Sequence, residues 1–283
     1  MRNIKASYLF NVESIAGKVD NFLINLDYDG NPILLIENNL SGKCLNEVYH
    51  FVNGKINKFT TPFISETFDF VQPLNGNWLL VNARIDEEEG YTENATLYNI
   101  NGNVLNTFSL DDAIQDVQTT MNGDIWVSYF DENMDSGLCC FNSNGNKIFD
   151  YKELVRKTGR KIPFILDCYA LNVTSDSTYV YYYTDFPLVK ISEKGYEIFS
   201  KIPVKGSHAF AIFNGFVLFS HDYNIKAEVY LYSLKNKKME RLRTLNENGE
   251  LLNYSYAVGR GSKLLFIKET DVFLLDLENL LIE

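Results

Sequence analysis

Two stretches of the sequence decide the fold: FDFVQPLNGNWLLV at residues 68–81 and QDVQTTMNGDIWVSYF at residues 115–130. Each stretch consists of an apolar run, an Asn-Gly turn and a second apolar run that contains a Trp. Asn-Gly between two β-rich runs predicts a hairpin, because both turn residues tolerate positive φ. The two turns lie 47 residues apart, at Gly76 and Gly123, and this spacing indicates an internal repeat.

The same unit recurs along the rest of the chain. Four further copies lie at residues 22–37, 169–185, 208–222 and 254–269. A second series of hairpins alternates with the first, and its turns lie near Gly54, Gly102, Gly145, Gly195, Asn236 and Asn279. Two hairpins make four strands, so six repeats predict an all-β, six-bladed β-propeller with four-stranded antiparallel blades. The second strands are almost continuously apolar, as expected for strands that are covered on both faces.

We expect one propeller domain over residues 1–283. Its predicted blades are approximately 20–60, 67–110, 114–151, 167–202, 207–245 and 253–283, the last together with 5–12. The spare strand SYLFNV at 7–12 is predicted to complete the sixth blade and so close the ring. Residues 279–283 are the competing candidate for that position. One helix is predicted, from a capping box at Asp150 and Glu153 to Gly159.

Composition excludes several classes of function. The formal net charge of −11 argues against a general nucleic-acid binder, which needs many Lys and Arg residues. The N-terminus does not read as a signal peptide, and no apolar run reaches the length that spans a bilayer. The four cysteines are too few for a disulfide framework and suit buried thiols in a reducing cytoplasm. We therefore expect a cytoplasmic protein with no nucleic-acid or membrane partner.

With this pattern of hairpins, the chain resembles the superfamily of bacterial propellers that includes the NHL, YVTN and sugar-lactone-lactonase groups. The resemblance covers the whole chain, and residues 116–132 and 167–191 look like segments of uncharacterised bacterial members. The Gly-His and Trp-Asp dipeptides that mark each repeat of a strict WD40 protein are missing. The acidic metal ligands of lactonases and a His-Glu lyase pair are not found in their usual setting. The resemblance therefore implies the fold and no reaction.

One face of the predicted propeller should carry the function. Turns within hairpins are uniformly tight and share one face, whereas the long connections share the other; these are residues 37–47, 84–94, 131–137, 221–228 and 152–167. Charges on these connections, predicted to face a partner, are Glu87, Glu88, Asp131, Arg156 and Arg160. Each charge run also reads simply as a solvated surface. Together they would orient a polar or protein partner.

The starts of the inner strands should surround the mouth of a central channel. The residues predicted to bind there are Asp69, Asp116, Asp167, Tyr169, His208 and Tyr254. A ring of carboxylates could hold Ca²⁺, with Asp69 and Asp116 as the candidate metal ligands, although Asp also commonly caps backbone groups. His208 is the candidate general base. We otherwise expect no cofactor.

The sequence favours a non-catalytic binding propeller that presents its loop-rich face to a protein or a small polar ligand. Neither a nucleophile elbow nor a glycine-rich phosphate loop is present. The alternative is a metal-assisted hydrolase or lyase, in which the Asp69 and Asp116 carboxylates hold a divalent cation and His208 moves a proton.

Overall fold

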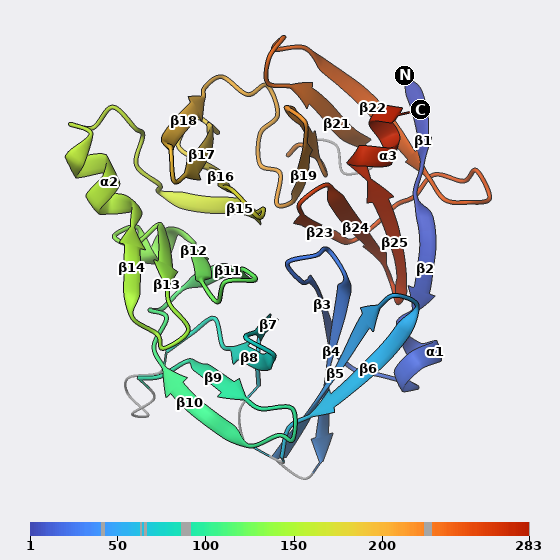
Figure 1. Cartoon of the computed structure of the whole chain (residues 1–283). Coiled ribbons are helices and arrows are strands. Elements are labelled where there is room, and N and C mark those ends of the chain that lie inside the picture. The colour runs from blue at the N-terminus through green and yellow to red at the C-terminus, as the bar shows by residue number, and fades with distance from the viewer. Residues whose placement is uncertain (41–42, 63, 65–66, 86–91, 224–227, 283) are drawn as a thin grey trace. The chain divides into compact units, whose positions relative to one another are not determined.

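The computed structural model describes residues 1–40, 43–62, 64, 67–85, 92–223 and 228–282. Its fold is an all-β, six-bladed propeller whose blades are four-stranded antiparallel sheets, as the repeat predicts. The chain divides into two compact units, Lys18–Cys168 and Met1–Gly17 with Tyr169–Glu283. Figure 1 shows the strands of four sheets in chain order, and the N-terminal strands β1 (Arg2–Lys5) and β2 (Ser7–Asn11) as additions to the last two sheets. In the described part of the chain, no helix has the length and apolar character needed to cross a membrane.

The unit Lys18–Cys168 contains three of the sheets. The first consists of β3 (Phe22–Leu26), β4 (Pro32–Leu40), β5 (Lys43–Val52) and β6 (Lys55–Thr60). The second consists of β7 (Phe70–Leu74), β8 (Asn77–Val81), β9 (Ala95–Tyr98) and β10 (Val104–Phe108). The third consists of β11 (Ile114–Thr119), β12 (Ile125–Tyr129), β13 (Leu138–Phe141) and β14 (Lys147–Asp150), with the 3-10 helix η1 (Asp131–Asn133) between β12 and β13.

The other unit contains the remaining sheets. The fourth consists of β15 (Asp167–Val173), β16 (Thr178–Tyr183), β17 (Leu188–Ser192) and β18 (Gly195–Phe199). The fifth consists of β19 (Phe210–Phe213), β20 (Phe216–Phe219), β21 (Glu228–Ser233) and β22 (Met239–Leu245), with β1 (Arg2–Lys5) as a fifth strand. The sixth consists of β23 (Tyr256–Arg260), β24 (Lys263–Lys268), β25 (Asp271–Asp276) and β2 (Ser7–Asn11).

The N-terminal strand completes the sixth blade, as predicted. Strand β2 pairs antiparallel with β25, and the two are seen side by side in Figure 1. The short helix α1 (Val12–Ala16) follows, and the Asn11 side chain that caps it also donates to Asp271 Oδ1 at 2.8 Å. Residues 279–282 are not a strand but part of helix α3 (Leu277–Ile282), so the competing candidate is wrong. Strand β1, which the repeat does not predict, pairs parallel with β22.

The strands are buried as the hydrophobic pattern predicts. Second strands such as β12 and β24 are buried along most of their length, whereas the outermost strands β6 and β10 are mostly exposed and β14 has no buried residue. The Asn75-Gly76 turn has positive φ at both residues, as its sequence predicts. In the turn at 120–124 only Gly123 has positive φ, because its N–H closes the turn by donating to the carbonyl of Thr120.

Buried amide side chains join the inner strands of neighbouring blades within each unit. Asn172, on β15, donates to the carbonyl of Phe210 at 2.7 Å and accepts from the N–H of Gly261 at 2.8 Å. In the other unit, Gln72 on β7 donates to the carbonyl of Leu26, and its own carbonyl oxygen lies 3.4 Å from the Thr119 hydroxyl. Each amide satisfies buried backbone or hydroxyl groups in two other blades, so it fixes how those blades pack.

Candidate functional site

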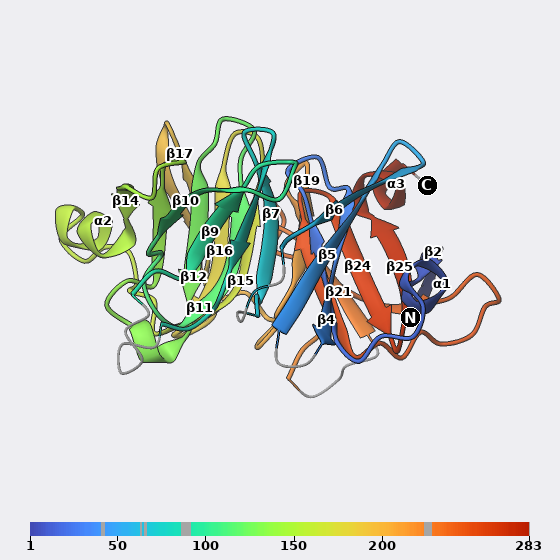
Figure 2. The same ribbon diagram turned by 90° about the horizontal axis from the view of Figure 1, so that it is seen from below.

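The connection from β14 to β15 carries the helix α2 (Tyr151–Lys157), at the position the capping box predicts. The Asp150 carboxylate accepts hydrogen bonds from the N–H groups of Lys152 and Glu153 and so caps the helix. At the other end, the N–H of Gly159 donates to the carbonyl of Arg156, and the N–H of Arg160 donates to the carbonyl of Val155. These two bonds form a Schellman motif, which requires positive φ at Gly159. Helix α2 lies outside β14 at the edge of its blade (Figure 2).

The segment after α2 folds back against the helix. Tyr151 is buried, and its hydroxyl donates to the carbonyl of Pro163 at 3.1 Å. Ile162 and Ile165 are buried, but Phe164 between them is 55% exposed. The loop after η1 packs on the same segment at Gly137, where a Cβ atom would lie 2.9 Å from Cβ of Ile165. Glycine at position 137 therefore permits this close approach.

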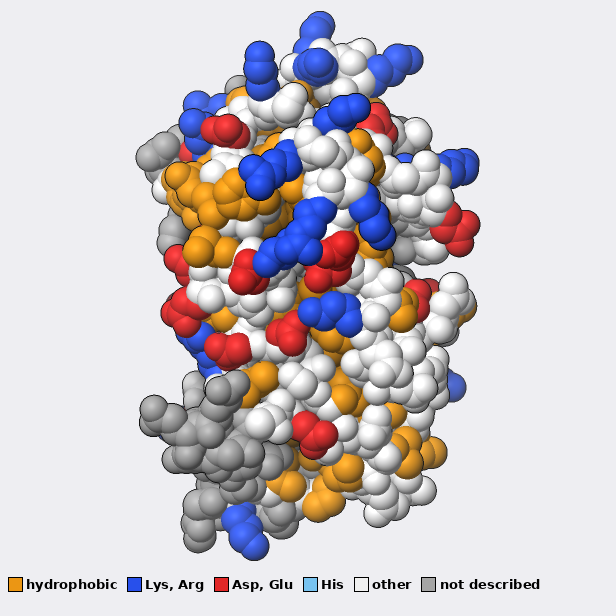
Figure 3. Space-filling model, turned by 90° about the vertical axis from the view of Figure 1, so that its left-hand side faces the viewer, with side chains coloured by type: hydrophobic (Ala, Val, Ile, Leu, Met, Phe, Trp, Pro, Cys, Tyr) orange, Lys and Arg blue, Asp and Glu red, His pale blue; other side chains and the backbone are white. Residues whose placement is uncertain are grey.

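These three segments enclose a groove of about 810 Å³, which we call the α2 groove. Its lining residues are Met134, Asp135, Ser136, Gly137, Tyr151, Lys152, Val155, Arg156, Arg160, Ile162, Pro163, Phe164, Ile165 and Leu166. Most of these side chains are apolar, and the charged ones belong to Asp135, Lys152, Arg156 and Arg160. Figure 3 views the side of the molecule on which α2 lies, where exposed hydrophobic side chains are interspersed with charged ones.

Two of the basic side chains of α2 form ion pairs. Lys152 contacts the Asp135 carboxylate on the loop after η1, and this contact lowers the pKa of Asp135. Arg156 contacts Glu153, one turn earlier on the helix. Both pairs are largely exposed, so each contributes little to stability. Among the described residues, no ion pair involves Lys157, Arg160 or Lys161.

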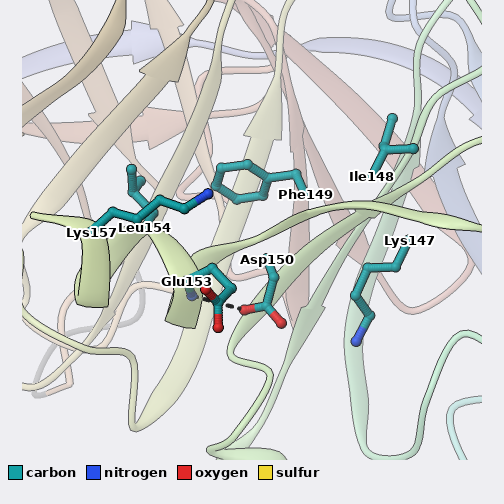
Figure 4. Close-up of a pocket in the computed structure, with 7 residues that line it drawn as sticks. All are labelled: Lys147, Ile148, Phe149, Asp150, Glu153, Leu154 and Lys157. Atoms are coloured by element: carbon teal, nitrogen blue, oxygen red, sulfur yellow. Dashed lines mark hydrogen bonds between the residues drawn. The ribbon is translucent and has the colours of Figure 1, made fainter.

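A second, smaller hollow of about 350 Å³ lies on the other side of α2, against β14 (Figure 4). Its lining residues are Lys147, Ile148, Phe149, Asp150, Glu153, Leu154 and Lys157. Figure 4 also shows the capping bond from the N–H of Glu153 to Asp150. Ile148 is 56% exposed here. Helix α2 is therefore accessible from two sides.

The predicted partner-facing residues are only partly brought together. Arg156 and Arg160 line the α2 groove, and Glu87 and Glu88 lie outside the described residues. Asp131 begins η1 and is exposed. The pKa of Asp167 is raised, mainly by burial of its own carboxyl group and in second place by the negative charge of Asp131. The loop after β12 and the segment before β15 thus meet, as expected for connections on one face.

The two candidate metal ligands each have a local hydrogen-bonding role. The Asp69 carboxylate accepts from the N–H of Ala83 at 2.7 Å, and that of Asp116 accepts from Gln118 Nε2 at 3.0 Å. The Asp69 bond matches the interpretation of Asp as a cap of backbone groups, whereas Asp116 accepts from another side chain. Within the described ranges, no group of three or more His, Cys, Asp or Glu side chains is placed to hold a metal ion. The metal site stays a prediction.

The other three predicted site residues lie in the unit that contains Tyr169–Glu283. The rings of Tyr169 and His208 stack with centroids 4.9 Å apart, and His208 stacks on His221 at 5.5 Å. The Tyr169 hydroxyl contacts that of Tyr223. We call Tyr169, Phe186, His208, His221 and Tyr223 the ring cluster. The sequence analysis missed His221 and Tyr223, which belong to the 221–228 connection.

Tyr254 is not part of the ring cluster. Its side chain is buried in the apolar core of this unit, where its ring centroid lies 4.6 Å from that of Phe266, and its hydroxyl donates to the carbonyl of Ser220. The Ser220 hydroxyl lies 2.9 Å from Nδ1 of His221 and 3.1 Å from the hydroxyl of Ser207. Because Ser207 and Ser220 are fully buried, neither hydroxyl is accessible to a substrate. This network therefore orients His221 and does not form a nucleophile.

Fold and groove together define a β-propeller in which the connection from β14 to β15 carries a helix and a groove. Residues 138–274, just under half of the chain, match the model of the YxzG family. No curated protein matches the chain by sequence.

The chain is also similar in structure to solved proteins of low sequence identity. Hsv2 of Kluyveromyces lactis is 10% identical with a TM-score of 0.53, over 90% of this chain and 73% of that one. BamB of Moraxella catarrhalis is 9% identical with a TM-score of 0.51, over 90% of this chain and 84% of that one. Apo AztD of Citrobacter koseri is 7% identical with a TM-score of 0.45, over 90% of this chain and 83% of that one. At these identities the likeness to Hsv2 and BamB supports the fold alone. The resemblance to the NHL, YVTN and lactonase groups stays a prediction.

Proposed function

We propose that the chain is a non-catalytic propeller that binds a protein partner with the surface around α2. A propeller is consistent with a binding scaffold, because rigid blades hold their connecting loops in fixed positions. The connection from β14 to β15 is such a loop. Its two hydrogen-bonded helix ends and the bond from Tyr151 to Pro163 give it a defined shape.

The observation that carries this proposal is the uncovered apolar surface of the α2 groove. Met134 and Phe164 are each 55% exposed and line the same groove. Single exposed apolar residues are common, but exposed apolar residues gathered in one concave patch with a charged rim are typical of interaction sites. Among the residues that the structure describes, the side chains leave about 810 Å³ beside them unfilled.

A protein fits this surface better than a small polar ligand does. A site for a small polar molecule needs several polar groups that converge on it from the lining. In the α2 groove the lining is mainly apolar, and two of its four charged side chains, Lys152 and Asp135, pair with each other. An apolar interior with a charged rim is the arrangement found in protein interfaces.

The alternative, a metal-assisted hydrolase or lyase, has less support. Asp69 and Asp116 each use a carboxylate oxygen in a local hydrogen bond, and the His208 ring stacks between Tyr169 and His221. In this alternative, Ca²⁺ is the metal ion that the sequence favours at the carboxylates of Asp69 and Asp116.

We propose a cytoplasmic location for the same protein. All four cysteines are buried and none forms a disulfide. Burial raises the pKa of the Cys139 thiol to about 12, which makes it unreactive. Buried free thiols suit a reducing compartment.

Photo-crosslinking in cells that express the chain tests the proposed function. The photoreactive amino acid p-benzoyl-phenylalanine replaces Phe164 in one variant and Tyr196 in the other. Tyr196 is the matched control, because it is an exposed aromatic residue on β18, away from the connections. We expect a protein adduct of defined mass at position 164 and none at position 196. Adducts at both positions, or at neither, would refute the proposal.

A further inference from the structure

The α2 groove differs from the rest of the molecule in its charge. The whole chain carries a net charge of −11, but residues 150–161 contain five basic and two acidic side chains. Of the two acidic residues, Asp150 caps α2 and Glu153 pairs with Arg156. The surface beside the groove is therefore locally cationic on an acidic protein, and it attracts a partner of negative charge.

Arg160 is the residue best placed to meet such a charge. It lines the groove, is exposed, and forms no ion pair with any described residue. The Schellman motif fixes its backbone, since its N–H donates to the carbonyl of Val155 at 2.9 Å. Lys161, also exposed, follows it directly. A guanidinium held in position in this way can bind a carboxylate through two parallel hydrogen bonds.

The apolar part of the groove defines the second requirement for the occupant. Its walls bring exposed Phe164 and Met134 together with buried Tyr151, Val155 and Ile165. Ligand pockets typically have volumes of about 300–1,000 Å³, and the α2 groove lies in that range. Interfaces commonly place one bulky aromatic side chain in a pocket of this kind, within a rim that excludes water.

We propose that the α2 groove binds an acidic peptide segment of a partner protein through one bulky aromatic side chain. The aromatic side chain enters between Val155 and Phe164, and flanking carboxylates contact Arg160 and Lys161. The inference rests on the proposed function, because it specifies the chemistry of the protein partner. Nucleic acid is also anionic, but the apolar lining and the net charge of −11 disfavour it.

Fluorescence anisotropy of the full chain with defined peptides tests this inference. The probe is a fluorescein-labelled peptide of roughly ten residues in which Asp and Glu flank one central Trp. One control peptide carries Ser in place of Trp, and the other carries Asn and Gln in place of the acidic residues. We expect saturable binding of the probe with a Kd on the order of 10 μM. Loss of Trp should raise the Kd about 30-fold, and loss of the acidic residues about 10-fold.

Matched variants of the chain locate the binding. Arg160→Glu should raise the Kd about 10-fold, whereas Lys194→Glu, at an exposed turn between β17 and β18, should leave it unchanged. Phe164→Ser should raise the Kd about 10-fold, with Tyr196→Ser as its control. Circular dichroism and Tm confirm that each variant is folded. A higher NaCl concentration should weaken binding of the probe and leave that of the uncharged control peptide unchanged.

Three results would overturn the inference. The first is no saturable binding of the probe up to about 1 mM. The second is an equal loss of affinity in Arg160→Glu and Lys194→Glu. The third is self-association of the chain that Arg160→Glu abolishes, since a second copy would then be the occupant. If the probe fails but the crosslink at position 164 forms, the proposed function stands and only the chemistry of the partner is wrong.

Discussion

The ring cluster and the α2 groove are both rich in aromatic and polar side chains, but they use these side chains differently. In the ring cluster the side chains contact one another: Phe186 is buried, and Tyr169, Tyr181 and Tyr223 all pack against its ring at 5.2–5.6 Å. In the α2 groove, Phe164 is exposed beside unfilled space. Residue type therefore does not identify a site, whereas unfilled space beside apolar groups does.

Deletion of residues 1–12 should have the largest effect. It removes β1 and β2 and exposes the edges of β22 and β25, in the unit that contains the ring cluster. It also uncovers the core against which Ile4 and Ala6 pack. We expect Tm to fall by about 10 °C or more. Differential scanning calorimetry measures this, with Lys5→Ala as the control. A fall of less than about 3 °C would mean that β2 does not hold the sixth blade.

Substitution of one Phe in each region tests the comparison directly. Phe186→Ala should lower the free energy of unfolding by about 3–5 kcal/mol, because it leaves a cavity among three tyrosine rings. Phe164→Ala should lower it by less than about 0.5 kcal/mol, because this side chain is 55% exposed. Urea denaturation measures both. Equal effects would contradict the view that only the ring cluster is filled.

A pair of glycines makes a finer comparison. Gly206 and Gly159 both have positive φ, at 73° and 64°, so alanine strains the backbone at either position. At Gly206 the added Cβ would also collide with the Tyr223 ring, whereas at Gly159 nothing lies within 4 Å. We expect Gly206→Ala to cost about 2 kcal/mol and Gly159→Ala about 1 kcal/mol. If thermal denaturation gives the reverse order, Tyr223 does not pack on Gly206 in solution.

The carboxylate of Asp167 should give the smallest effect. Its pKa is raised by burial and by Asp131. Because the folded state then disfavours the ionised form, this carboxylate costs stability at neutral pH, and the cost disappears as pH falls toward the unfolded pKa of about 4. Asp167→Asn should therefore raise Tm slightly at pH 7 and leave it unchanged near pH 4. Glu193→Gln, at an exposed turn, is the control. A lower Tm of Asp167→Asn at pH 7 would mean that the ionised carboxylate is stabilising.

The sequence predicts those parts of the fold that depend on local chemistry. The Asn75-Gly76 turn, the cap at Asp150 and the C-terminal glycine of α2 are each encoded within a few residues. The pairing of β2 with β25 was also predictable. The C-terminal repeat supplies only three strands of its blade, and the N-terminal strand β2 is the one available as the fourth. Strand β1 was not predictable, since a parallel fifth strand breaks the repeat.

The candidate site was less predictable. The basic residues Arg156 and Arg160 stand out in the sequence, but the groove beside them depends on distant contacts. Tyr151 must bond to Pro163, and Gly137 must allow Ile165 to approach. Tyr254 is a residue for which the sequence predicted a binding role that the structure does not support. Its place before an inner strand suggested a binding residue, but its side chain is buried in the core. Whether each of these side chains lines a groove or lies in the core depends on tertiary packing, which no local sequence pattern encodes.

Hydrogen exchange of the wild-type chain with and without the acidic Trp peptide would show where on the propeller a partner binds. Amide protection reports where a ligand orders or covers the backbone. We expect slower exchange at residues 134–137 and 151–166 when the peptide is bound, with no change at residues 207–223 of the ring-cluster region. Slower exchange at residues 207–223, with none beside α2, would show that the ring cluster is the binding surface and would contradict the account.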